Sequence, residues 1–322
     1  MAPPPRARRE KRVRLGRVWG IVTTDASTAA AASLAVITVT YSPGHHLRAL
    51  ADSLGGATER PTLLLCVDNG STDGVAEALA AEREDVEFLP TGGNIGYGAA
   101  VNAGVRALAA RRRAGEIDRD YFAVVNPDVQ FGAGSVDTLV RCAEARPRAG
   151  AVGPRIAEAD GSTYPSAREV PGLVTGIGHA VLGGLWPTNP FSAAYQANGD
   201  MDHERAAGWL SGSCLVVRWD AFDSIGGFDE RYFMYMEDID LGDRFTRAGW
   251  ANIFCPEAVI RHDQGHVASR YSSVTVPAHH ASAYRFQADR HPAVWQAPVR
   301  AVLWLGLKVR AAVLAARHTL KG

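Results

Sequence analysis

The sequence predicts an α/β fold with a mainly parallel central sheet flanked by helices. Short apolar runs rich in β-branched residues alternate with segments of helical spacing across residues 34–125, which is typical of strands joined by crossover helices. Turn-forming Gly, Pro, Asn or Asp residues close most of these runs. The chain has 322 residues, of which 47% are hydrophobic and 21% charged. This size fits one large domain with an appendage, or two domains.

The elements of the first half follow from their periods and end signals. Short apolar runs predict strands at residues 34–41, 62–67, 86–89 and 121–125. Helical spacing predicts helices at residues 46–54, 75–83 and 102–113. Because strands and helices alternate, we expect right-handed crossovers and a parallel sheet that binds ligands beyond the carboxyl ends of its strands.

The second half is less regular. We expect a flexible loop in the glycine-rich stretch from Gly172 to Gly184, which has no clear period. Ordered structure is predicted again at residues 208–217, followed by helices at residues 219–224 and 236–248, the second ending at Gly249. The apolar run Ala258–Ile260 predicts a further strand.

Composition excludes several classes of protein. The four cysteines are separated by 76, 72 and 41 residues, so no C-x-x-C pair marks a zinc ribbon or a redox motif, and we expect a reduced cytosolic chain. No run approaches the roughly 20 apolar residues of a membrane span. The start also lacks the apolar core of a signal peptide, so we expect neither export nor a span.

The net charge of zero conceals an uneven distribution. Residues 1–19 hold seven Lys or Arg and one acid, and residues 296–322 hold five and none, which leaves 22 basic and 33 acidic residues between them. The acidic body argues against a nucleic-acid partner, whereas two basic ends fit an anionic membrane surface. Alternatively, the first 19 residues, with three prolines, form a disordered arm.

Polar residues follow three of the predicted strands at equivalent ends. Thr40, Asp68 and Asp128 lie at or just past the ends of separate strands. A single Asp in such a place is usually a turn former or a helix cap. Three residues at equivalent ends predict one shared crevice.

Four carboxylates gather at a predicted helix start between Glu237 and Asp243. Acids favour helix N-termini, and Asp240 with Arg244 forms an ordinary i,i+4 pair. Aromatic and apolar neighbours should hold at least one of these carboxylates in a partly dry cleft, where a general base operates.

His262 follows the run Ala258–Ile260. A single His is more often a structural hydrogen-bonding residue, but beside Asp128 its imidazole fits a second ligand for a divalent ion that also binds substrate phosphate. His266 is less well placed.

The glycine loop 92–98 has the order G-x-x-G-x-G, and no P-loop motif occurs. Dinucleotide-dependent oxidoreductases and P-loop NTPases are therefore disfavoured. The loop still allows a ligand to approach the backbone closely before a helix N-terminus.

A set of motifs occurs in one order along residues 34–265: Val39-Thr40-Tyr41, Val67-Asp68-Asn69-Gly70-Ser71-Thr72-Asp73, Gly93-Asn94-Ile95-Gly96, Asn102-Ala103-Gly104, Asn126-Pro127-Asp128, Gly212-Ser213-Cys214, Gly226-Gly227-Phe228-Asp229 and Glu237-Asp238-Ile239-Asp240-Leu241. In these motifs the chain resembles the inverting glycosyltransferases of family 2, which have the GT-A fold. Within that family it is most similar to actinobacterial enzymes that transfer L-rhamnose from dTDP-rhamnose to N-acetylglucosaminyl diphosphoryl polyprenol in the mycobacterial-type cell-wall linker. Many relatives carry a basic residue where this chain has Val101, which puts a donor-phosphate contact there in doubt.

The resemblance implies a division of the chain. Residues 1–33 would be a basic arm and residues 34–265 the GT-A catalytic domain, with a nucleotide-sugar half at 34–130 and an acceptor half at 131–265. Residues 266–322 would be a helical extension.

The resemblance also implies a single displacement at the anomeric carbon of a nucleotide-sugar. Asp238 would be the general base, supported by Glu237, Asp240 and Arg244. Asp128 and His262 would hold Mg²⁺ or Mn²⁺. The residues implied for the donor are Thr40, Asp68, Asn94, Gly96, Asn102 and Asp128, and Asp68 would accept a hydrogen bond from the imide N–H of the nucleotide base. The residues implied for the acceptor are Trp209, Ser211 and Gly212. A core position for Trp209 is equally compatible with the sequence.

The implied partners are dTDP-rhamnose or a UDP-sugar and a polyprenyl-diphosphate-linked sugar. Basic residues interrupt the stretch 300–317, so it would lie on an anionic membrane through Leu303, Trp304, Leu307 and Leu314, at the cytoplasmic face of the plasma membrane. Packing on the domain or at a homo-oligomer interface is the alternative.

Two rival functions remain open. A nucleotidyltransferase should carry a basic residue in its first glycine-rich loop, and residues 40–45 have none. A non-catalytic sugar-nucleotide-binding protein would not need Asp128, Asp238 and His262 together.

Overall fold

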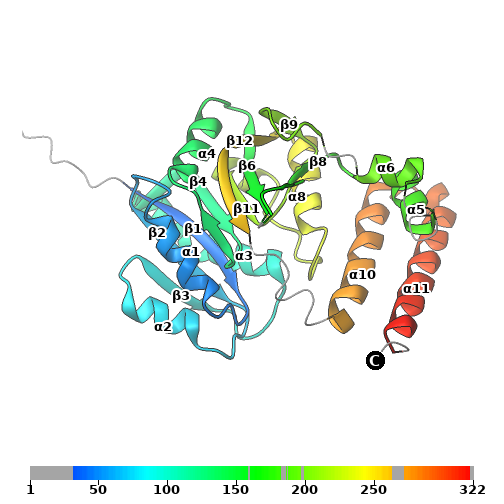
Figure 1. Cartoon of the computed structure of the whole chain (residues 1–322), viewed down its shortest axis with the longest axis horizontal. Coiled ribbons are helices and arrows are strands. Elements are labelled where there is room, and N and C mark those ends of the chain that lie inside the picture. Colours follow the sequence, from blue (N-terminus) through cyan, green and yellow to red (C-terminus); the bar gives the residue numbers. More distant parts are fainter. Residues whose placement is uncertain are drawn as a thin grey trace, which may run out of the picture. The chain divides into compact units, whose positions relative to one another are not determined.

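A central sheet with helices on both faces organises the part of the chain that the computed structural model describes, residues 32–158, 160–182, 186, 188–196, 199–262 and 272–319 (Figure 1). The first half contains β1 (Ser33–Thr40), α1 (His46–Leu54), β2 (Thr62–Asp68), α2 (Val75–Glu82), β3 (Val86–Pro90), α3 (Tyr97–Ala114) and β4 (Ile117–Val125). The predicted alternation of strands and helices is confirmed.

The second half adds shorter strands and more helices. These elements are β5 (Val129–Phe131), α4 (Ser135–Glu144), β6 (Ala149–Ala157), β7 (Thr163–Tyr164), β8 (Ala167–Arg168), α5 (Leu173–Leu182), α6 (Pro190–Gln196), β9 (Arg205–Ala207), β10 (Trp209–Leu210), β11 (Cys214–Arg218), α7 (Trp219–Ser224), α8 (Glu237–Arg247) and β12 (Ala251–His262). The predicted helices at 219–224 and 236–248 correspond to α7 and α8.

The strands of the main sheet follow the order β3-β2-β1-β4-β11-β6-β12-β5, with β7 beside β6 and β9 beside β12. The neighbours β3, β2, β1 and β4 are parallel, whereas β11 runs antiparallel between β4 and β6. Strand β12 is parallel to β6 and antiparallel to β5. The carboxyl ends of β1, β2 and β4 therefore share one edge, and the end of β12 pairs with the strand that follows Asp128.

Two apolar clusters fill the two faces of this sheet. Leu34 and Val36 of β1 pack with α1, α2 and α4, while Ala35 and Ile37 pack with α3, α7 and α8. All four side chains are fully buried. Strand β1 is covered on both sides, which explains why it reads as a continuous apolar run.

Two predictions that concern helices are wrong. The stretch expected to be a flexible loop forms α5, and a Cβ on Gly178 would lie 2.2 Å from Cγ of Phe191, so glycine lets α6 pack closely on α5. Residues 183–185 lie outside the described part of the chain. Helix α3 begins five residues earlier than predicted, because Gly96, at φ 91°, makes the turn into the helix.

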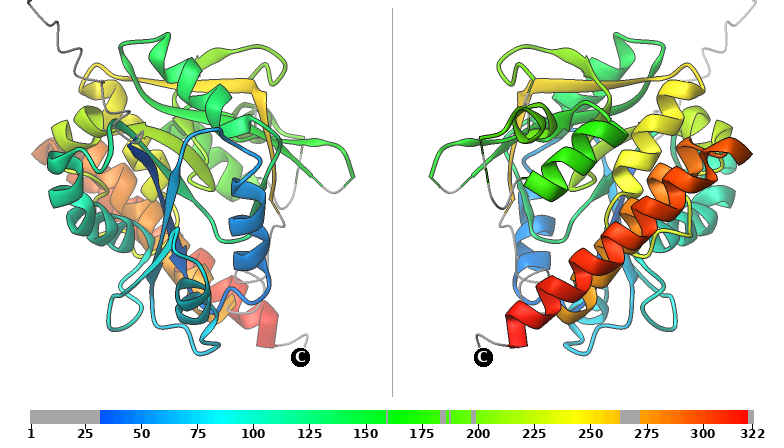
Figure 2. Two further views of the ribbon diagram at one scale, coloured as in Figure 1. Left: turned by 90° about the vertical axis from the view of Figure 1, so that its left-hand side faces the viewer. Right: turned by 90° about the vertical axis from the view of Figure 1, so that its right-hand side faces the viewer.

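The carboxyl-terminal extension consists of α10 (Ser272–Arg290), η1 (Val294–Gln296) and α11 (Ala297–Thr319). Helix α10 packs on the catalytic part, where Asp289 pairs with Arg231 at 2.7 Å and the Gln287 amide donates to the Pro171 carbonyl at 3.1 Å. Helix α11 lies along α10 (Figures 1 and 2). Among the described helices, none has the length and apolarity needed to cross a bilayer.

Candidate active site

Asp68 lies at the end of β2 and holds the loop that follows it. Its carboxylate accepts hydrogen bonds from the hydroxyls of Thr40, at 2.7 Å, and Ser71, and from the backbone N–H groups of Gly70 and Ser71, at 3.1 and 2.9 Å. Burial raises the pKa of Asp68, but these hydrogen bonds outweigh it and hold the pKa below the ordinary value. Four donors occupy all four acceptor positions of the carboxylate, so the turn-forming alternative accounts for every contact of this residue.

The loops after β2 and β3 are joined to each other. The amide of Asn69 donates to the carbonyl of Gly96 at 3.2 Å, and the Thr91 hydroxyl contacts the carbonyls of Asp68 and Gly93 at 2.8 and 2.6 Å. Asn94 is exposed, and its side-chain oxygen accepts from the N–H of Gly96 at 3.1 Å. These two loops form one surface at the carboxyl ends of β1 and β2.

Asp128 and His262 meet, although 134 residues separate them, because β12 pairs with β5 and places His262 opposite Val129. The Asp128 Oδ1 and His262 Nε2 atoms lie 3.0 Å apart, with both side chains largely buried. Nδ1 of His262 is buried and has no partner among the described residues, so the ring presents Nε2 to Asp128. The two residues predicted to share a metal ion therefore lie in contact, and their role as metal ligands stays a prediction.

This pair fits a divalent cation. Two ligand atoms at right angles and about 2.1 Å from an ion lie roughly 3 Å apart, as in octahedral Mg²⁺ coordination, and the Asp128–His262 separation of 3.0 Å agrees with that spacing. Carboxylate and imidazole are ligands that Mn²⁺ accepts, and carboxylate also suits Mg²⁺. The remaining positions of such an ion would be open to phosphate oxygens or water.

A short chain of contacts leads from this pair to Asp238. The Asn126 amide lies 3.4 Å from His262 Nε2, and the Asn126 backbone N–H donates to the Ser213 carbonyl at 2.8 Å. The neighbouring Gly212 N–H donates to Oδ2 of Asp238 at 3.1 Å. The segments 126–128, 211–213 and 237–238 are thus parts of one site.

Tyr97 lies at the centre of these segments. Its hydroxyl donates to the Gly212 carbonyl at 2.8 Å. Burial raises its pKa well above the ordinary value, and the charges of Glu237, Asp238 and Asp128 raise it further. The phenol therefore stays protonated. The negative charges of Asp128 and Asp238 both raise its pKa, so both carboxylates lie near Tyr97.

Asp238 lies in surroundings that favour its protonated form. Burial raises its pKa above the ordinary value, while the N–H groups of Gly212 and Ile239 and the charge of Arg168 lower it in part. Burial and the charge of Asp238 also raise the pKa of Glu237, whose Oε2 has no partner among the described residues. This adjacent pair therefore acquires its second negative charge only at raised pH.

The backbone before α8 is strained. Tyr235 and Met236 have φ of 65° and 68° and directly precede Glu237 and Asp238. Non-glycine residues adopt this left-handed conformation at a cost of the order of 1 kcal/mol each, and such strain occurs often at active sites. The two residues turn the chain so that the first turn of α8 faces Gly212.

Asp240 and Arg244 form a support rather than a reactive pair. Arg244 donates to Asp240 at 2.6 Å and to the carbonyls of Ile225 and Gly227 at 3.0 and 2.7 Å. These contacts hold the Gly226–Gly227 turn against α8, and the predicted support of Asp238 by this pair stays a prediction.

Asn102 was predicted to shape the donor pocket, and the structure gives it another task. Its side-chain oxygen accepts from the Phe228 N–H at 3.0 Å, and its amide donates to the Phe228 carbonyl at 2.9 Å and to Glu230 at 3.1 Å. The residue is 6% exposed. All its polar atoms therefore serve to hold the turn after α7.

The predicted acceptor residues differ in their positions. Gly212 contacts Asp238, and a Cβ there would lie 3.3 Å from Cβ of Asp238. The Ser211 hydroxyl lies 3.0 Å from that of Ser213. Trp209 packs instead with Tyr232, Met236, Ile239 and Phe286, and its indole N–H donates to the Glu169 carbonyl at 3.1 Å. Trp209 thus fits the core alternative, and His266 lies outside the described residues.

Sequence reasoning missed Tyr97 and Arg168 as parts of the site. Tyr97 directly follows the glycine loop, so its place at the start of a helix after G-x-x-G was the available signal. Arg168 had no local signal, because it reaches the site through the pairing of β8 with β10.

Comparisons with known proteins agree with this geometry. Residues 35–195 match the model of glycosyl transferase family 2. An N-acetylglucosaminyl-diphospho-decaprenol L-rhamnosyltransferase of Mycobacterium tuberculosis is 51% identical over 280 residues, 86% of this chain and 91% of that protein.

Two solved structures share the GT-A fold with this chain. Their sequence identities are low, so the likeness concerns the fold alone. Residues 1–349 of TarS from S. aureus, in complex with UDP-GlcNAc, give a TM-score of 0.54 at 12% identity, with 86% of this chain and 72% of that chain covered. The mannosyltransferase PcManGT from Pyrobaculum calidifontis, in complex with GDP-Man and Mn²⁺, gives 0.51 at 18% identity, with 89% and 79% covered.

Proposed function

Because the chain belongs to glycosyl transferase family 2, we propose that it transfers L-rhamnose from dTDP-rhamnose to a polyprenyl-diphosphate-linked N-acetylglucosamine. The observation that carries this proposal is the contact chain joining the Asp128–His262 pair to a carboxylate of raised pKa, Asp238. The identity of 51% with the mycobacterial rhamnosyltransferase supports the choice of sugar and acceptor.

Asp238 is the proposed general base. Its Oδ2 is held by Gly212 and its Oδ1 by the backbone N–H of Ile239 at 2.9 Å. As the acceptor hydroxyl attacks the anomeric carbon, its proton passes to Asp238 and the bond between that carbon and the diphosphate breaks. The attack comes from the side opposite the leaving group, so the anomeric configuration inverts.

Asp128 and His262 would hold Mg²⁺ or Mn²⁺. When bound there, the ion supplies Lewis-acid neutralisation of the negative charge that develops on the departing diphosphate. The Mn²⁺ in the mannosyltransferase of the same fold is consistent with this choice.

The loops after β2 and β3 would receive the nucleotide. Asp68 would shape this nucleotide site indirectly, because the four hydrogen bonds that its carboxylate accepts hold the loop after β2 in place. We therefore assign Asp68 as a positioning residue, in place of the direct contact with the base that the resemblance implied. Gly96 lets the segment before α8 approach this loop closely, since the Phe233 carbonyl lies only 2.7 Å from where a Cβ would be.

An anionic membrane surface is the proposed location of the acceptor, and the exposed side of η1 and α11 is the proposed contact. Trp295, Val302, Leu305 and Val309 are 55–78% exposed there. The chain from residue 291 onward contains five Lys or Arg and no acid, a charge that complements anionic lipid. Of the leucines predicted to contact the membrane, Leu303 and Leu307 are partly buried, and the side chain of Leu314 lies outside the described residues.

The test is a transfer assay with the full chain and a synthetic polyprenyl-diphosphate N-acetylglucosamine. We expect mass spectrometry to detect a product heavier by one deoxyhexose with dTDP-rhamnose, together with release of dTDP. Transfer from a UDP-sugar but not from dTDP-rhamnose would favour the second candidate, another sugar transferase of cell-surface polysaccharide. Nucleotide-sugar binding without any transfer would contradict both.

A further inference from the structure

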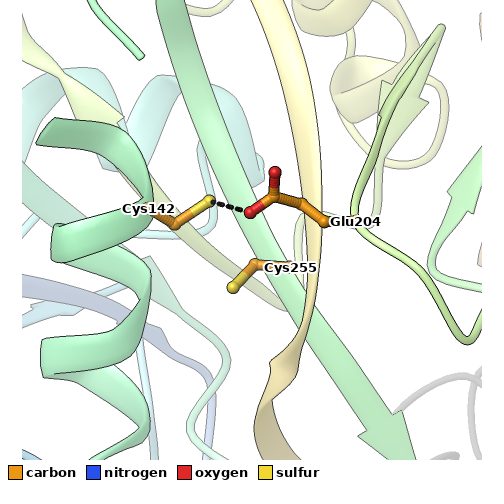
Figure 3. A group of neighbouring side chains, drawn as sticks. All are labelled: Cys142, Glu204 and Cys255. Carbon is orange, nitrogen blue, oxygen red and sulfur yellow. Dashed lines mark hydrogen bonds between the residues drawn. The ribbon is translucent and has the colours of Figure 1, made fainter. Parts of the chain in front are cut away.

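Two buried thiols and a carboxylate gather on the sheet face that α4 covers, in a different apolar cluster from the one that packs under α3 and α8. Cys142 lies on α4, Cys255 on β12 and Glu204 on the segment before β9 (Figure 3). One ligand atom from each lies within 4.8 Å of the others. Cys142 and Cys255 are 7% and 2% exposed, whereas about a third of the Glu204 side chain is open to solvent.

Arg146 fixes the direction of the Glu204 carboxylate. Its guanidinium pairs with Oε1 of Glu204, which leaves Oε2 facing the Cys142 Sγ atom at 3.4 Å. Another nitrogen of Arg146 donates to the Cys142 carbonyl at 3.2 Å and lies 3.7 Å from Cys142 Sγ. The carboxylate is thus oriented toward the thiols by a partner outside the group, as outer-shell residues orient metal ligands.

We propose that Cys142, Cys255 and Glu204 bind a zinc ion, with a water molecule as fourth ligand. Zinc takes thiolate sulfur at about 2.3 Å and carboxylate oxygen at about 2.1 Å in a tetrahedron, which puts neighbouring sulfur and oxygen ligands about 3.5 Å apart. The Cys142–Glu204 separation of 3.4 Å agrees with this value.

The charges also balance. On binding, each thiol releases its proton to solvent, so two thiolates, one carboxylate and the zinc ion carry one net negative charge. The guanidinium of Arg146 offsets it. A disulfide between the two cysteines would use neither the carboxylate nor its orientation by Arg146.

A zinc ion in this position joins three separate elements. It connects α4 and β12 to the segment before β9, and β9 pairs with β12 through Arg205 and Phe254. The pairing of β12 with β6 is irregular directly after Cys255. Because β9 leads into residues 208–213, zinc would stabilise the approach to the Gly212 loop without touching the reacting atoms.

The experiment uses the full chain, freed of metal by dialysis against a chelator, with Co²⁺ as a spectroscopic probe and then Zn²⁺. We expect one equivalent of Co²⁺ to produce the thiolate-to-cobalt charge-transfer absorption and Zn²⁺ to displace it. Cys142→Ser and Cys255→Ser should lose this absorption, and Glu204→Gln should release the metal to a weaker chelator.

Matched controls separate this site from others. Cys66→Ser and Cys214→Ser also alter buried cysteines, and both should keep the absorption. Asp128→Ala should keep it too, since thiolate absorption does not arise from an Asp–His site.

Two outcomes would overturn the proposal. The first is a failed metal test, in which the wild type binds no stoichiometric metal through thiolate or Cys142→Ser keeps the thiolate absorption. The second is recovery of a Cys142–Cys255 disulfide as the native state of the metal-free protein. If the serine variants fail to fold, thermal unfolding decides. Zn²⁺ should raise the Tm of the wild type and of Asp128→Ala, and an unchanged Tm would contradict the site.

Discussion

Two aspartates, one on each side of the site, show how surroundings divide their roles. Asp68 accepts four hydrogen bonds, and these hold its pKa below the ordinary value. Asp238 accepts two, both from backbone N–H groups, and burial raises its pKa. The first carboxylate stays ionised and holds a loop in shape. The second is easier to protonate, which a general base requires.

The two sides of the site also differ in which residues adopt the left-handed backbone conformation. On the donor side the left-handed positions are Ser42 and several glycines, among them Gly70 and Gly96. On the acceptor side Tyr235 and Met236 adopt that conformation directly before Asp238. The donor side is therefore built mostly from residues that tolerate its geometry, whereas the acceptor side keeps strain beside the proposed general base.

The largest expected effect comes from removing the base. Asp238→Asn should keep donor binding while turnover falls by about 10²- to 10⁴-fold, the usual cost of losing general-base catalysis. The amide preserves the shape of the side chain and cannot take the proton. Single-turnover transfer and donor titration would measure the two properties separately.

Asp240→Asn is the matched control for this change, since Asp240 lies in the same turn of α8 and pairs with Arg244. Asp240→Asn should lower the free energy of unfolding, while the rate of the chemical step should change little. Activity of Asp238→Asn within a few-fold of wild type would remove Asp238 from its role and make Glu237 the next candidate.

The pH profile tests the same carboxylate. Since burial raises the pKa of Asp238, the acid limb of kcat/KM should lie above the ordinary Asp value of 3.8. The charge of Arg168 lowers this pKa, so Arg168→Gln should move the limb to higher pH and Arg168→Lys should leave it nearly in place. A limb at or below the ordinary value would contradict the assignment.

Loss of a metal ligand should come next in size. Asp128→Asn and His262→Gln should each raise the Mn²⁺ or Mg²⁺ concentration for half-maximal activity at least about tenfold, a cost that even outer-shell partners reach. His203→Gln is the control, because His203 forms a similar pair with Asp200, at 2.6 Å, on the surface. Full activity in excess EDTA would exclude the metal role.

A pair of threonines on β1 isolates the donor-side network. Thr40 and Thr38 are both fully buried, but only Thr40 donates to Asp68, and the Thr38 hydroxyl has no partner among the described residues. Thr40→Val should lower the free energy of unfolding by about 1–3 kcal/mol, the cost of leaving a buried charged acceptor short of a donor. Thr38→Val should be neutral or stabilising in the same urea titrations.

The sign of the pH dependence follows from the lowered pKa of Asp68. The stability that this carboxylate contributes is present above its unfolded-state pKa, near 3.8, and is lost as the pH falls through its lower folded-state pKa. The penalty of Thr40→Val should therefore shrink in acid. If Thr40→Val and Thr38→Val change the free energy of unfolding equally at neutral pH, the hydrogen bonds to Asp68 do not contribute to stability.

Membrane contact should give the smallest effect. Val302→Asp with Leu305→Asp should reduce co-sedimentation with anionic vesicles several-fold, because both side chains are exposed on α11 and acids oppose anionic lipid. Val259→Asp, at an exposed apolar position on β12, is the control. Binding that is unaffected by salt and by both substitutions would assign α11 to the fold or to a subunit interface.

The local pattern of the sequence determined much of this protein. The strands and helices of the first half lie within a few residues of their predicted bounds, apart from the earlier starts of α3 and β4, because apolar period and turn residues are local properties. The motif positions and the family resemblance also selected Asp68, Asp128, Asp238 and His262 as candidate site residues, and their roles stay predictions. The Asp128–His262 contact forms because His262 ends β12 and Asp128 directly precedes β5, the strand that pairs with β12.

Only the tertiary structure decided which way each side chain acts. The sequence predicts a donor contact for Asn102 and leaves Trp209 between an acceptor contact and the core, and the structure places Asn102 against a turn and Trp209 in the core. The spacing of the cysteines excluded a zinc ribbon and a C-x-x-C redox motif and gave no sign of any other cluster, yet α4 and β12 bring Cys142 and Cys255 to one carboxylate across 113 residues of sequence. Burial, pKa direction and such contacts depend on how distant elements pack, and no local period encodes that packing.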